Sequence, residues 1–360
     1  MQIVYKFKIK LTQIWLLKNY DFSLLVTIFH RKNPFESKHV KQWFRELLLE
    51  IYQVASTLFK IMIPAMLLVK LLEELGGVEI IAALLGPVMV LVGLPESMAL
   101  VWATTLLTNI YTGMVIFFNQ APLEQLSVAQ VTVLGTMMLI AHTLPIEARI
   151  AQKAGVRLGV TLLIRLLSAV LLGFVLHHLY AWGGWLQQPS QMIWQPGEVP
   201  AGLIAWGVVQ LKSLGVILVI ISLLLTTLKL LRLLGIERLL QWLLQPMLRM
   251  LGIGRAATTI TIVGFTLGLA FGGGLLIKEA QAGHVPYRDV FSAMTLLALC
   301  HSMIEDTLLI LLLGADISGI FWMRLVYGFV AVALISRLME SSSERFHRRY
   351  LIHSPETAGS

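Results

Sequence analysis

Apolar stretches follow one another along almost the whole chain, separated by short polar segments. A membrane-spanning helix needs about 20 mostly apolar residues. Six stretches meet this length: Ile51–Leu72, Ser97–Phe118, Val160–Tyr180, Leu203–Leu228, Ala256–Ile277 and Ile317–Leu338. Four others are shorter or interrupted: Ile80–Gly93, Val128–Leu144, Leu239–Leu251 and Val290–Met303. Such segments are typical of half-helices and re-entrant hairpins. The pattern predicts an all-α, polytopic membrane protein.

The composition supports this prediction. Of the 360 residues, 57% are hydrophobic and 13% are charged, with a mean hydropathy of +0.79. A soluble domain is closer to half apolar and a quarter charged. The net charge of +8 fits basic loops on the cytoplasmic side of a membrane, so nucleic acid is not an expected partner. The single cysteine, Cys300, excludes an intrachain disulfide and a cysteine-based metal cluster.

The chain matches itself at one constant offset, the one that places His142 on His301. Leucine matches are common by composition in a membrane protein, but this gapless alignment also pairs proline, glycine and arginine. These further matches are Pro87 with Pro246, Gly93 with Gly252, Gly113 with Gly272, Gly155 with Gly314, and Arg165 with Arg324. The match indicates an internal repeat of the kind that builds many transporters.

The repeat divides the chain into five parts. Residues 1–44 form an N-terminal extension, either interfacial or a misassigned start, because its apolar stretch is interrupted by Lys18 and Asp21. Residues 45–181 form repeat 1, 182–202 a polar connection and 203–338 repeat 2. Residues 339–360 form a polar, basic tail that we expect to be solvated in the cytoplasm.

Charge indicates how the repeats are oriented. After its first span, repeat 1 is acidic where repeat 2 is basic. The acidic residues are Glu73, Glu74, Glu79 and Glu96, and the basic residues are Arg232, Arg238, Arg249 and Arg255. Equivalent loops of opposite charge bias lie on opposite sides of a membrane. We therefore expect inverted repeats in the cell (inner) membrane. Each has about three full spans and a re-entrant hairpin, and both termini are cytoplasmic.

Inverted repeats require an odd number of crossings in each repeat, and this requirement predicts which segments are hairpins. If Ser97–Phe118 crosses the membrane, then Val128–Gly155 must enter and return on one side, turning near His142 and Pro145. Its equivalent in repeat 2 is Tyr287–Gly314, which turns near His301.

The two hairpin tips would meet near the middle of the membrane and form a site. They bring polar and ionisable side chains together, and such groups inside a bilayer mark function by default. We expect His142, Thr143, His301 and Ser302 to contact a substrate, and Glu147, Glu305 and Asp306 to couple an ion. The alternative is that each histidine only caps a half-helix.

The second span of each repeat would form the opposite wall of this site. Asn109 and Thr112 belong to it in repeat 1, and Gly272, Gly273 and Gly274 in repeat 2. Consecutive glycines destabilise a helix by about 1 kcal/mol each, so an unwound, substrate-binding backbone is expected there, with close helix packing as the alternative. Arg165 and Arg324 lie just inside their spans; we expect them to snorkel to the interface, with pairing to a hairpin carboxylate as the alternative.

Two segments resemble the nucleoside-recognition, or Gate, membrane proteins. They are Ala141–Arg149, with Ala154–Arg157, and His301–Thr307, and the resemblance covers about residues 45–338. Gate domains are similar to the pore regions of concentrative nucleoside transporters and of ferrous-iron transporter B, and to spore-maturation membrane proteins. The resemblance implies inverted repeats with hairpins. The chain lacks the G-x-x-x-x-G-K-[ST] loop of a GTPase, which argues against iron transport of that kind.

These observations favour a secondary transporter or permease for a small polar, nucleoside-like solute. Its partners would be the solute, the lipid bilayer and a coupling ion, H⁺ or Na⁺, with a homo-oligomer possible and no cofactor expected. Divalent-cation passage and a membrane scaffold or assembly role without transport are the alternatives; whether the site holds a metal stays open. An enzyme is not expected, because H-E-x-x-H and G-x-S-x-G motifs are absent.

Overall fold

The computed structural model describes residues 37–75, 77–121, 124–192, 202–233, 235–267, 276–280, 283 and 285–352. The regular elements of these residues are all helices, with no β-strand and two isolated bridges. The protein is therefore an all-α, polytopic membrane protein, as the sequence predicts. Residues 1–36 of the predicted N-terminal extension lie outside the described residues, and its last part already belongs to the first long helix.

The helices of the two repeats follow each other in nearly the same order along the chain. Repeat 1 contains α3 (Ser37–Glu74), α4 (Gly77–Leu91), α5 (Met98–Leu107), α6 (Ile110–Gln120), α7 (Val128–Ile140), α8 (Leu144–Lys153) and α9 (Leu158–Gly183). Repeat 2 contains α10 (Leu203–Leu233), α11 (Ile236–Met250), α12 (Arg255–Leu267), α14 (Tyr287–Cys300), α15 (Glu305–Leu311), the π-helical turn η2 (Ser318–Met323) and α16 (Arg324–Ser341). α11 begins and ends at positions that the repeat offset pairs with the first and last residues of α4, which supports the repeat.

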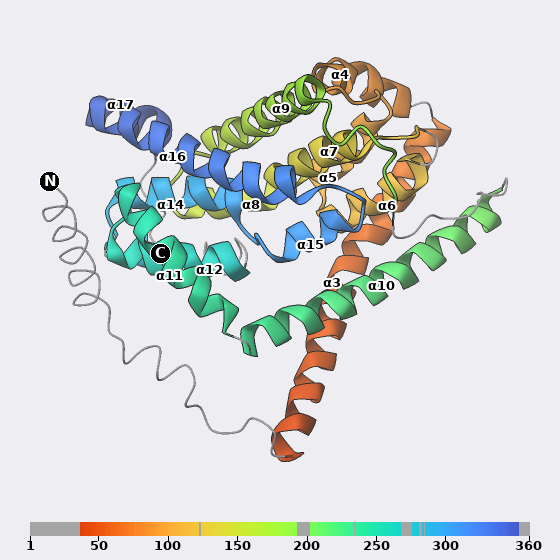
Figure 1. The fold of residues 1–360 in the computed structure, drawn as a ribbon, viewed down its shortest axis with the longest axis horizontal. Helices are drawn as coiled ribbons and strands as arrows, with labels where there is room; N and C mark the ends of the chain where they lie inside the picture. The colour runs from red at the N-terminus through yellow and green to blue at the C-terminus, as the bar shows by residue number, and fades with distance from the viewer. Residues whose placement is uncertain are drawn as a thin grey trace, which may run out of the picture.

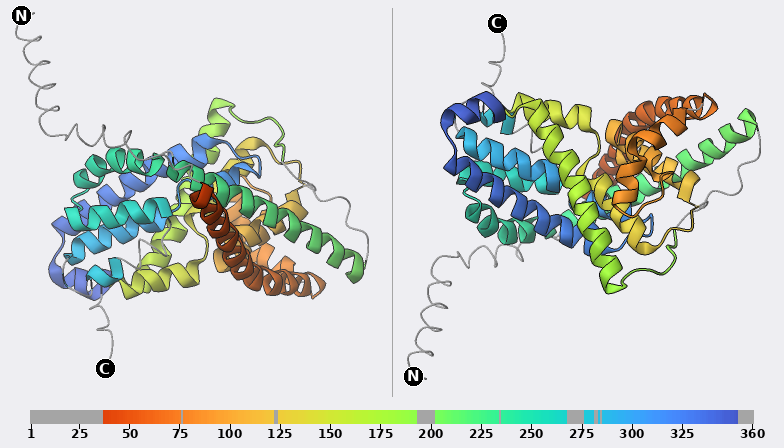
Figure 2. Two further views of the ribbon diagram at one scale, coloured as in Figure 1. Left: turned by 90° about the horizontal axis from the view of Figure 1, so that it is seen from below. Right: turned by 90° about the horizontal axis from the view of Figure 1, so that it is seen from above.

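Six helical segments in the described part of the chain are long and apolar enough to cross a membrane. They are Gln42–Leu68, Val128–Lys153, Leu158–Gly183, Leu203–Leu231, Tyr287–Leu311 and Ser318–Ser341. In two of them, Val128–Lys153 and Tyr287–Leu311, 78% of the most apolar stretch is buried inside the protein. In the other four the buried share is 18–33%. These two segments therefore form the centre of the molecule. Figure 2 shows α3 and α10 crossing each other at one side of the bundle, where they also pack together.

Both central segments are broken helices rather than hairpins. α7 and α8 form one interrupted run and both pack along α9, and α14 and α15 form another along α16 and η2 (Figure 1). A hairpin would instead pack its two arms on each other. The predicted hairpins at Val128–Gly155 and Tyr287–Gly314 are therefore wrong in position. A proline near the start of a helix is compatible with a helix that restarts, so Pro145 does not require the chain to turn back.

The hairpin of repeat 1 lies where the sequence predicts a full span. α5 and α6 are each about half the length that a bilayer requires, and they pack against each other. The Ser97 hydroxyl donates to Glu124 Oε1 at 2.6 Å, so the two ends of the hairpin meet. Gly113 allows this close approach, because a side chain there would collide with Thr105 of α5. The residues of repeat 2 that the offset pairs with this turn begin at 268 and lie outside the described residues.

Contacts between loops define two faces of the bundle. The Glu96 face comprises residues 93–97, 124–127, 184–190 and 313–316. It is joined by bonds such as Gln130 Nε2 to the Gly93 carbonyl (3.1 Å) and the Ser190 hydroxyl to the Gly314 carbonyl (3.3 Å). The Arg157 face comprises residues 153–157, 252–254, 286–289 and 342–352. It is joined by Gly254 N–H to Asp289 Oδ2 (2.9 Å) and by Tyr287 Oη to His347 Nδ1 (3.3 Å).

The two faces show that the repeats are inverted. α7 begins at the Glu96 face, whereas its equivalent α14 begins at the Arg157 face. The α5–α6 hairpin opens on the Glu96 face, and α12 begins at the Arg157 face. Within the described residues, each repeat contributes three candidate crossings, an odd number, which inversion requires.

Part of the predicted solvated tail is packed against the bundle. α17 (Glu344–Phe346) and the π-helical turn η3 (His347–Leu351) return to the Arg157 face, where the Leu351 carbonyl accepts from Arg157 N–H at 2.9 Å. The His347 side chain is fully buried and lies 2.7 Å from the Ser342 hydroxyl. The basic side chains Arg345, Arg348 and Arg349 remain exposed. Residues 353–360 lie outside the described residues.

Candidate functional site

The breaks in the two central helices have the same geometry. Thr143 between α7 and α8 has φ of 50°, and its equivalent Ser302 between α14 and α15 has φ of 46°. A residue other than glycine adopts this left-handed conformation rarely, at a cost of about 1–3 kcal/mol, and such strain is concentrated at functional sites. At each break the backbone leaves the helical hydrogen-bond pattern near the middle of the membrane-spanning segment, and its polar groups bond other parts of the protein. The two breaks are therefore paired positions at which polar backbone faces the interior of the protein.

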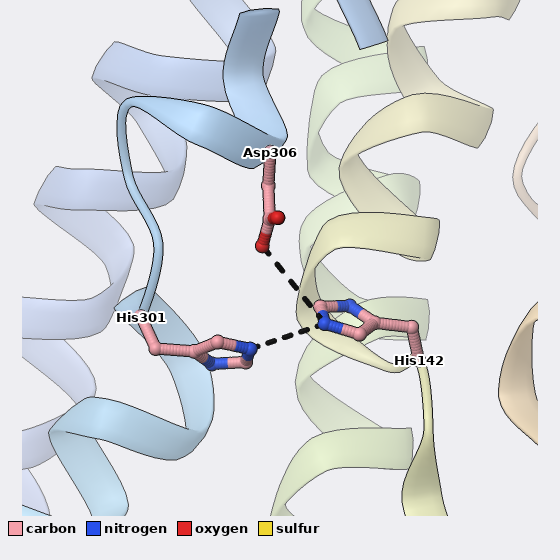
Figure 3. A group of neighbouring side chains, drawn as sticks. All are labelled: His142, His301 and Asp306. Atoms are coloured by element: carbon pink, nitrogen blue, oxygen red, sulfur yellow. Dashed lines mark hydrogen bonds and ion pairs between the residues drawn. The ribbon is translucent and has the colours of Figure 1, made fainter. Parts of the chain in front are cut away.

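The two histidines meet between these breaks. The Nε2 atoms of His142 and His301 are 3.1 Å apart, and the two rings face each other across the boundary between the repeats (Figure 3). His142 Nδ1 lies 3.0 Å from the Met138 carbonyl, and His301 Nδ1 lies 2.7 Å from the Leu297 carbonyl. Both residues are buried, with residue exposures of 5% and 3%. The predicted meeting of the two histidines is confirmed.

Two carboxylates converge on the histidine pair, one from each repeat. Glu147 Oε1 lies 3.1 Å from His301 Nε2 and 3.5 Å from His142 Nε2. Asp306 Oδ2 lies 3.9 Å from His142 Nε2, and Figure 3 shows its carboxylate aimed at the ring pair. The repeat offset places Glu147 on Asp306, so the two carboxylates are equivalent in the repeats. The four side chains form one buried cluster, which we call the histidine–carboxylate cluster: His142, His301, Glu147 and Asp306.

Two buried arginines support the cluster. Arg165 and Arg324 are fully buried, and their Nε atoms donate to the equivalent carbonyls of Ile140 (2.8 Å) and Leu299 (2.9 Å). These carbonyls belong to the last turns of α7 and α14, where helical partners are missing. The expected snorkelling is therefore wrong. For Arg165, the alternative of pairing with a carboxylate is confirmed, because Arg165 Nη1 donates to Glu147 Oε2.

The support differs between the repeats. Arg324 Nη2 donates to the His301 carbonyl at 3.0 Å, and no described residue forms a hydrogen bond with Arg324 Nη1 or Asp306 Oδ2. The aspartate is one methylene shorter than the glutamate in the other repeat. The Asp306 carboxylate therefore stays available, whereas that of Glu147 is already paired.

The α5–α6 hairpin lies against the first break. The Thr143 N–H donates to the Thr105 carbonyl at 3.1 Å. At the tip, Asn109 Oδ1 accepts from the Thr112 N–H at 2.9 Å and so caps α6. The Asn109 Nδ2 group is buried and, among the described residues, has no hydrogen-bond partner. Asn109 and Thr112 thus shape the hairpin tip.

Other predicted site residues have different positions. The Tyr111 hydroxyl donates to Glu305 Oε1 at 3.5 Å, so Glu305 links α15 to the hairpin rather than joining the histidine pair. Gly272, Gly273 and Gly274 lie outside the described residues. Hydropathy favours an interfacial position for Arg165 and Arg324, although the same repeat that pairs the histidines also pairs these arginines. Tyr111 carries no signal in the sequence.

Comparison with known proteins gives one informative relative. The chain is 31% identical over 291 residues to a protein of Bacillus subtilis (strain 168) named "Uncharacterized membrane protein YvoD"; the match covers 76% of this chain and 87% of the relative. No model of a known protein family matches, so membership of the Gate family stays a prediction, and no solved structure matches. The helical fold with six candidate membrane spans agrees with the name of the relative. The chain therefore belongs to the family of the membrane protein YvoD.

Proposed function

We propose that the protein is a secondary transporter or permease for a small polar solute, with nucleoside-like molecules as the first candidates. One observation carries the proposal: two broken helices, one from each inverted repeat, meet at their breaks, where ionisable side chains cluster near the middle of two long apolar segments. Discontinuous helices at the interface of inverted repeats are typical of substrate and ion sites in secondary transporters. The resemblance to Gate domains provides the nucleoside-like candidate.

The strained breaks and the hairpin tip would contact the solute. Thr143, Ser302 and the Asn109 amide offer polar groups at the breaks and at the hairpin tip. Of the two equivalent carboxylates, Asp306 is the better candidate for coupling to H⁺ or Na⁺, because Glu147 is already paired with Arg165. Rocking of one repeat against the other would then expose the breaks to alternate sides.

We also propose that the Arg157 face is cytoplasmic, in the cell (inner) membrane. Basic residues of the described chain gather there: Lys153, Arg157, Arg288, Arg345, Arg348 and Arg349. The Glu96 face contains Glu96, Glu124 and Asp316 instead. Cytoplasmic loops carry an excess of lysine and arginine. This orientation puts both ends of the described chain on the cytoplasmic side.

A thermal-shift screen tests the transport proposal. The purified protein, stripped of metals with a chelator, is screened against nucleosides, nucleobases and small organic acids. A ligand that binds only the folded state stabilises it by about 2.7 kcal/mol at one hundred times its dissociation constant. We expect a solute that raises the melting temperature and that is taken up by proteoliposomes containing the protein.

Variants locate the binding site. Replacing both Asn109 and Thr112 with Ala should remove the shift, because the hairpin tip loses its polar groups. His178→Ala is the matched control, because His178 is exposed on α9, away from the breaks. A well-folded sample that responds to no solute contradicts the proposal and favours the scaffold role.

A further inference from the structure

The hydrogen bonds of the two histidines fix their protonation pattern. A backbone carbonyl only accepts hydrogen bonds, so Nδ1 of His142 and of His301 must each carry a proton to bond the carbonyls of Met138 and Leu297. In the neutral rings both Nε2 atoms then present lone pairs. These lone pairs face each other at 3.1 Å, an arrangement that is favourable only with a cation between or beside them.

Carboxylate oxygens from both repeats lie beside this point. Glu147 Oε1 lies within 3.5 Å of both Nε2 atoms. One ligand atom from each of His142, His301 and Asp306 can be chosen so that all three lie within 4.8 Å of one another. Asp306 Oδ2 is buried and has no hydrogen-bond partner among the described residues. Its free oxygen points to a missing positive partner at the centre of the cluster.

We propose that the histidine–carboxylate cluster binds one divalent first-row transition metal ion. His142 Nε2, His301 Nε2 and Asp306 Oδ2 are its ligands, with Glu147 Oε1 as the fourth. Imidazole and carboxylate donors suit Zn²⁺, Fe²⁺ or Co²⁺ rather than Ca²⁺, which takes oxygen ligands alone. A tetrahedral ion with metal–nitrogen bonds of about 2.0–2.1 Å separates two nitrogen ligands by roughly 3.3–3.4 Å. The observed 3.1 Å requires a movement of only a few tenths of an ångström.

The surroundings also have the form of a metal site. Metal-binding histidines usually donate their second ring N–H to a carbonyl or carboxylate, which fixes the ring and its lone pair. Both histidines do so here, with carbonyls four residues earlier in the chain.

The proposed ion would join the two repeats. Each repeat supplies one histidine and one carboxylate at equivalent positions, so neither repeat alone forms the site. Metal binding does not depend on the transport proposal. It is measured without any solute, whereas the solute screen uses metal-free protein, so the failure of one leaves the other standing.

Calorimetric titration of the tag-free, chelator-stripped protein with Zn²⁺ and Co²⁺ tests the proposal. We expect one ion per chain and, for Co²⁺, the visible absorption of a four-coordinate site. His142→Gln and His301→Gln should each weaken binding at least about 100-fold, more than the loss of an outer-sphere partner. Asp306→Asn should also weaken binding, because Oδ2 is a ligand.

A control variant excludes adventitious binding. His177 and His178 are adjacent on α9 and are the competing histidine pair, so replacing both with Ala should leave the affinity unchanged. Zn²⁺ should raise the melting temperature of the wild type but not that of His142→Gln. A cooperative melting transition of the variant without metal shows that it is folded. Absence of stoichiometric binding, or binding that the His177/His178 variant alone removes, overturns the proposal and leaves a shared proton as the cation between the histidines.

Discussion

Two equivalent carboxylates differ at the scale of single residues. Glu147 is held by Arg165, whereas Asp306, its counterpart in the other repeat, does not reach Arg324. Both side chains are buried, with residue exposures of 8% and 7%. Removing one member of a buried ion pair is costly because the partner stays behind as an uncompensated charge. The two repeats therefore differ in whether this carboxylate is paired with its arginine.

Glu147→Gln should destabilise the metal-free protein by about 3–5 kcal/mol, because it strands the buried Arg165. Asp306→Asn should cost at least about 2 kcal/mol less, since it removes no arginine pair. The melting temperatures of the two variants in detergent, measured side by side, check this order. Equal losses would mean that Asp306 and Arg324 are paired after all.

At the scale of elements, two adjacent segments look alike in sequence but fold differently. Both 97–120 and 128–153 are apolar with a polar interruption near the middle. The first folds back at Asn109, where α6 restarts beside α5. The second continues after Thr143, so that α8 completes the crossing that α7 begins. The folded-back segment is the hairpin, and the continued one carries the ionisable residues.

Single cysteine substitutions of Glu96, Gln125 and Lys153 distinguish these arrangements. Each is made in a Cys300→Ala background and treated with a membrane-impermeant thiol reagent. We expect the cysteines at positions 96 and 125 to react from the same side of the membrane, because both ends of the α5–α6 hairpin lie on the Glu96 face. The cysteine at position 153 should react only from the other side.

Permeabilised membranes are the control that all three introduced cysteines can react. Labelling of positions 125 and 153 from one side, opposite to position 96, would restore the full span at Ser97–Phe118 and the hairpin at Val128–Gly155.

At the scale of the whole molecule, two inverted repeats share one buried centre. α7 of repeat 1 packs on η2 of repeat 2, and α14 of repeat 2 packs on α9 of repeat 1. The Asp316 N–H donates to the Thr132 hydroxyl at 2.8 Å across this boundary. Because each repeat covers the broken helix of the other, the two breaks are enclosed only in the complete molecule.

The substitutions Glu79→Cys and Arg238→Cys, each made in the same Cys300→Ala background, test the inversion. The two positions are equivalent in the repeats, and opposite faces follow from three crossings in each. We expect impermeant reagents to label the Glu79→Cys variant from outside intact cells, and the Arg238→Cys variant only after permeabilisation. A cysteine in place of the exposed Arg349 in the tail serves as the cytoplasmic reference. Same-side labelling at positions 79 and 238 would mean that the repeats are parallel.

The sequence by itself determined the membrane class, the repeat and the residues at its centre. The hydropathy of a segment depends only on its own consecutive residues. It therefore reveals, without any knowledge of tertiary contacts, which apolar segments are long enough to cross a bilayer. The offset that pairs His142 with His301 also pairs Glu147 with Asp306 rather than with Glu305. The sequence predicts all four side chains of the cluster, but it also places Glu305 with them, whereas the structure places Glu305 beside Tyr111.

Only the tertiary structure decided which segment turns back and which charges are paired. Whether a helix reverses or continues after a break depends on contacts between residues far apart in sequence, such as Ser97 with Glu124. The burial of Arg165 depends on the same kind of contact, because its guanidinium donates to the Ile140 carbonyl and to the Glu147 carboxylate instead of reaching water. Direction and pairing are properties of the packed molecule, and local hydropathy contains neither.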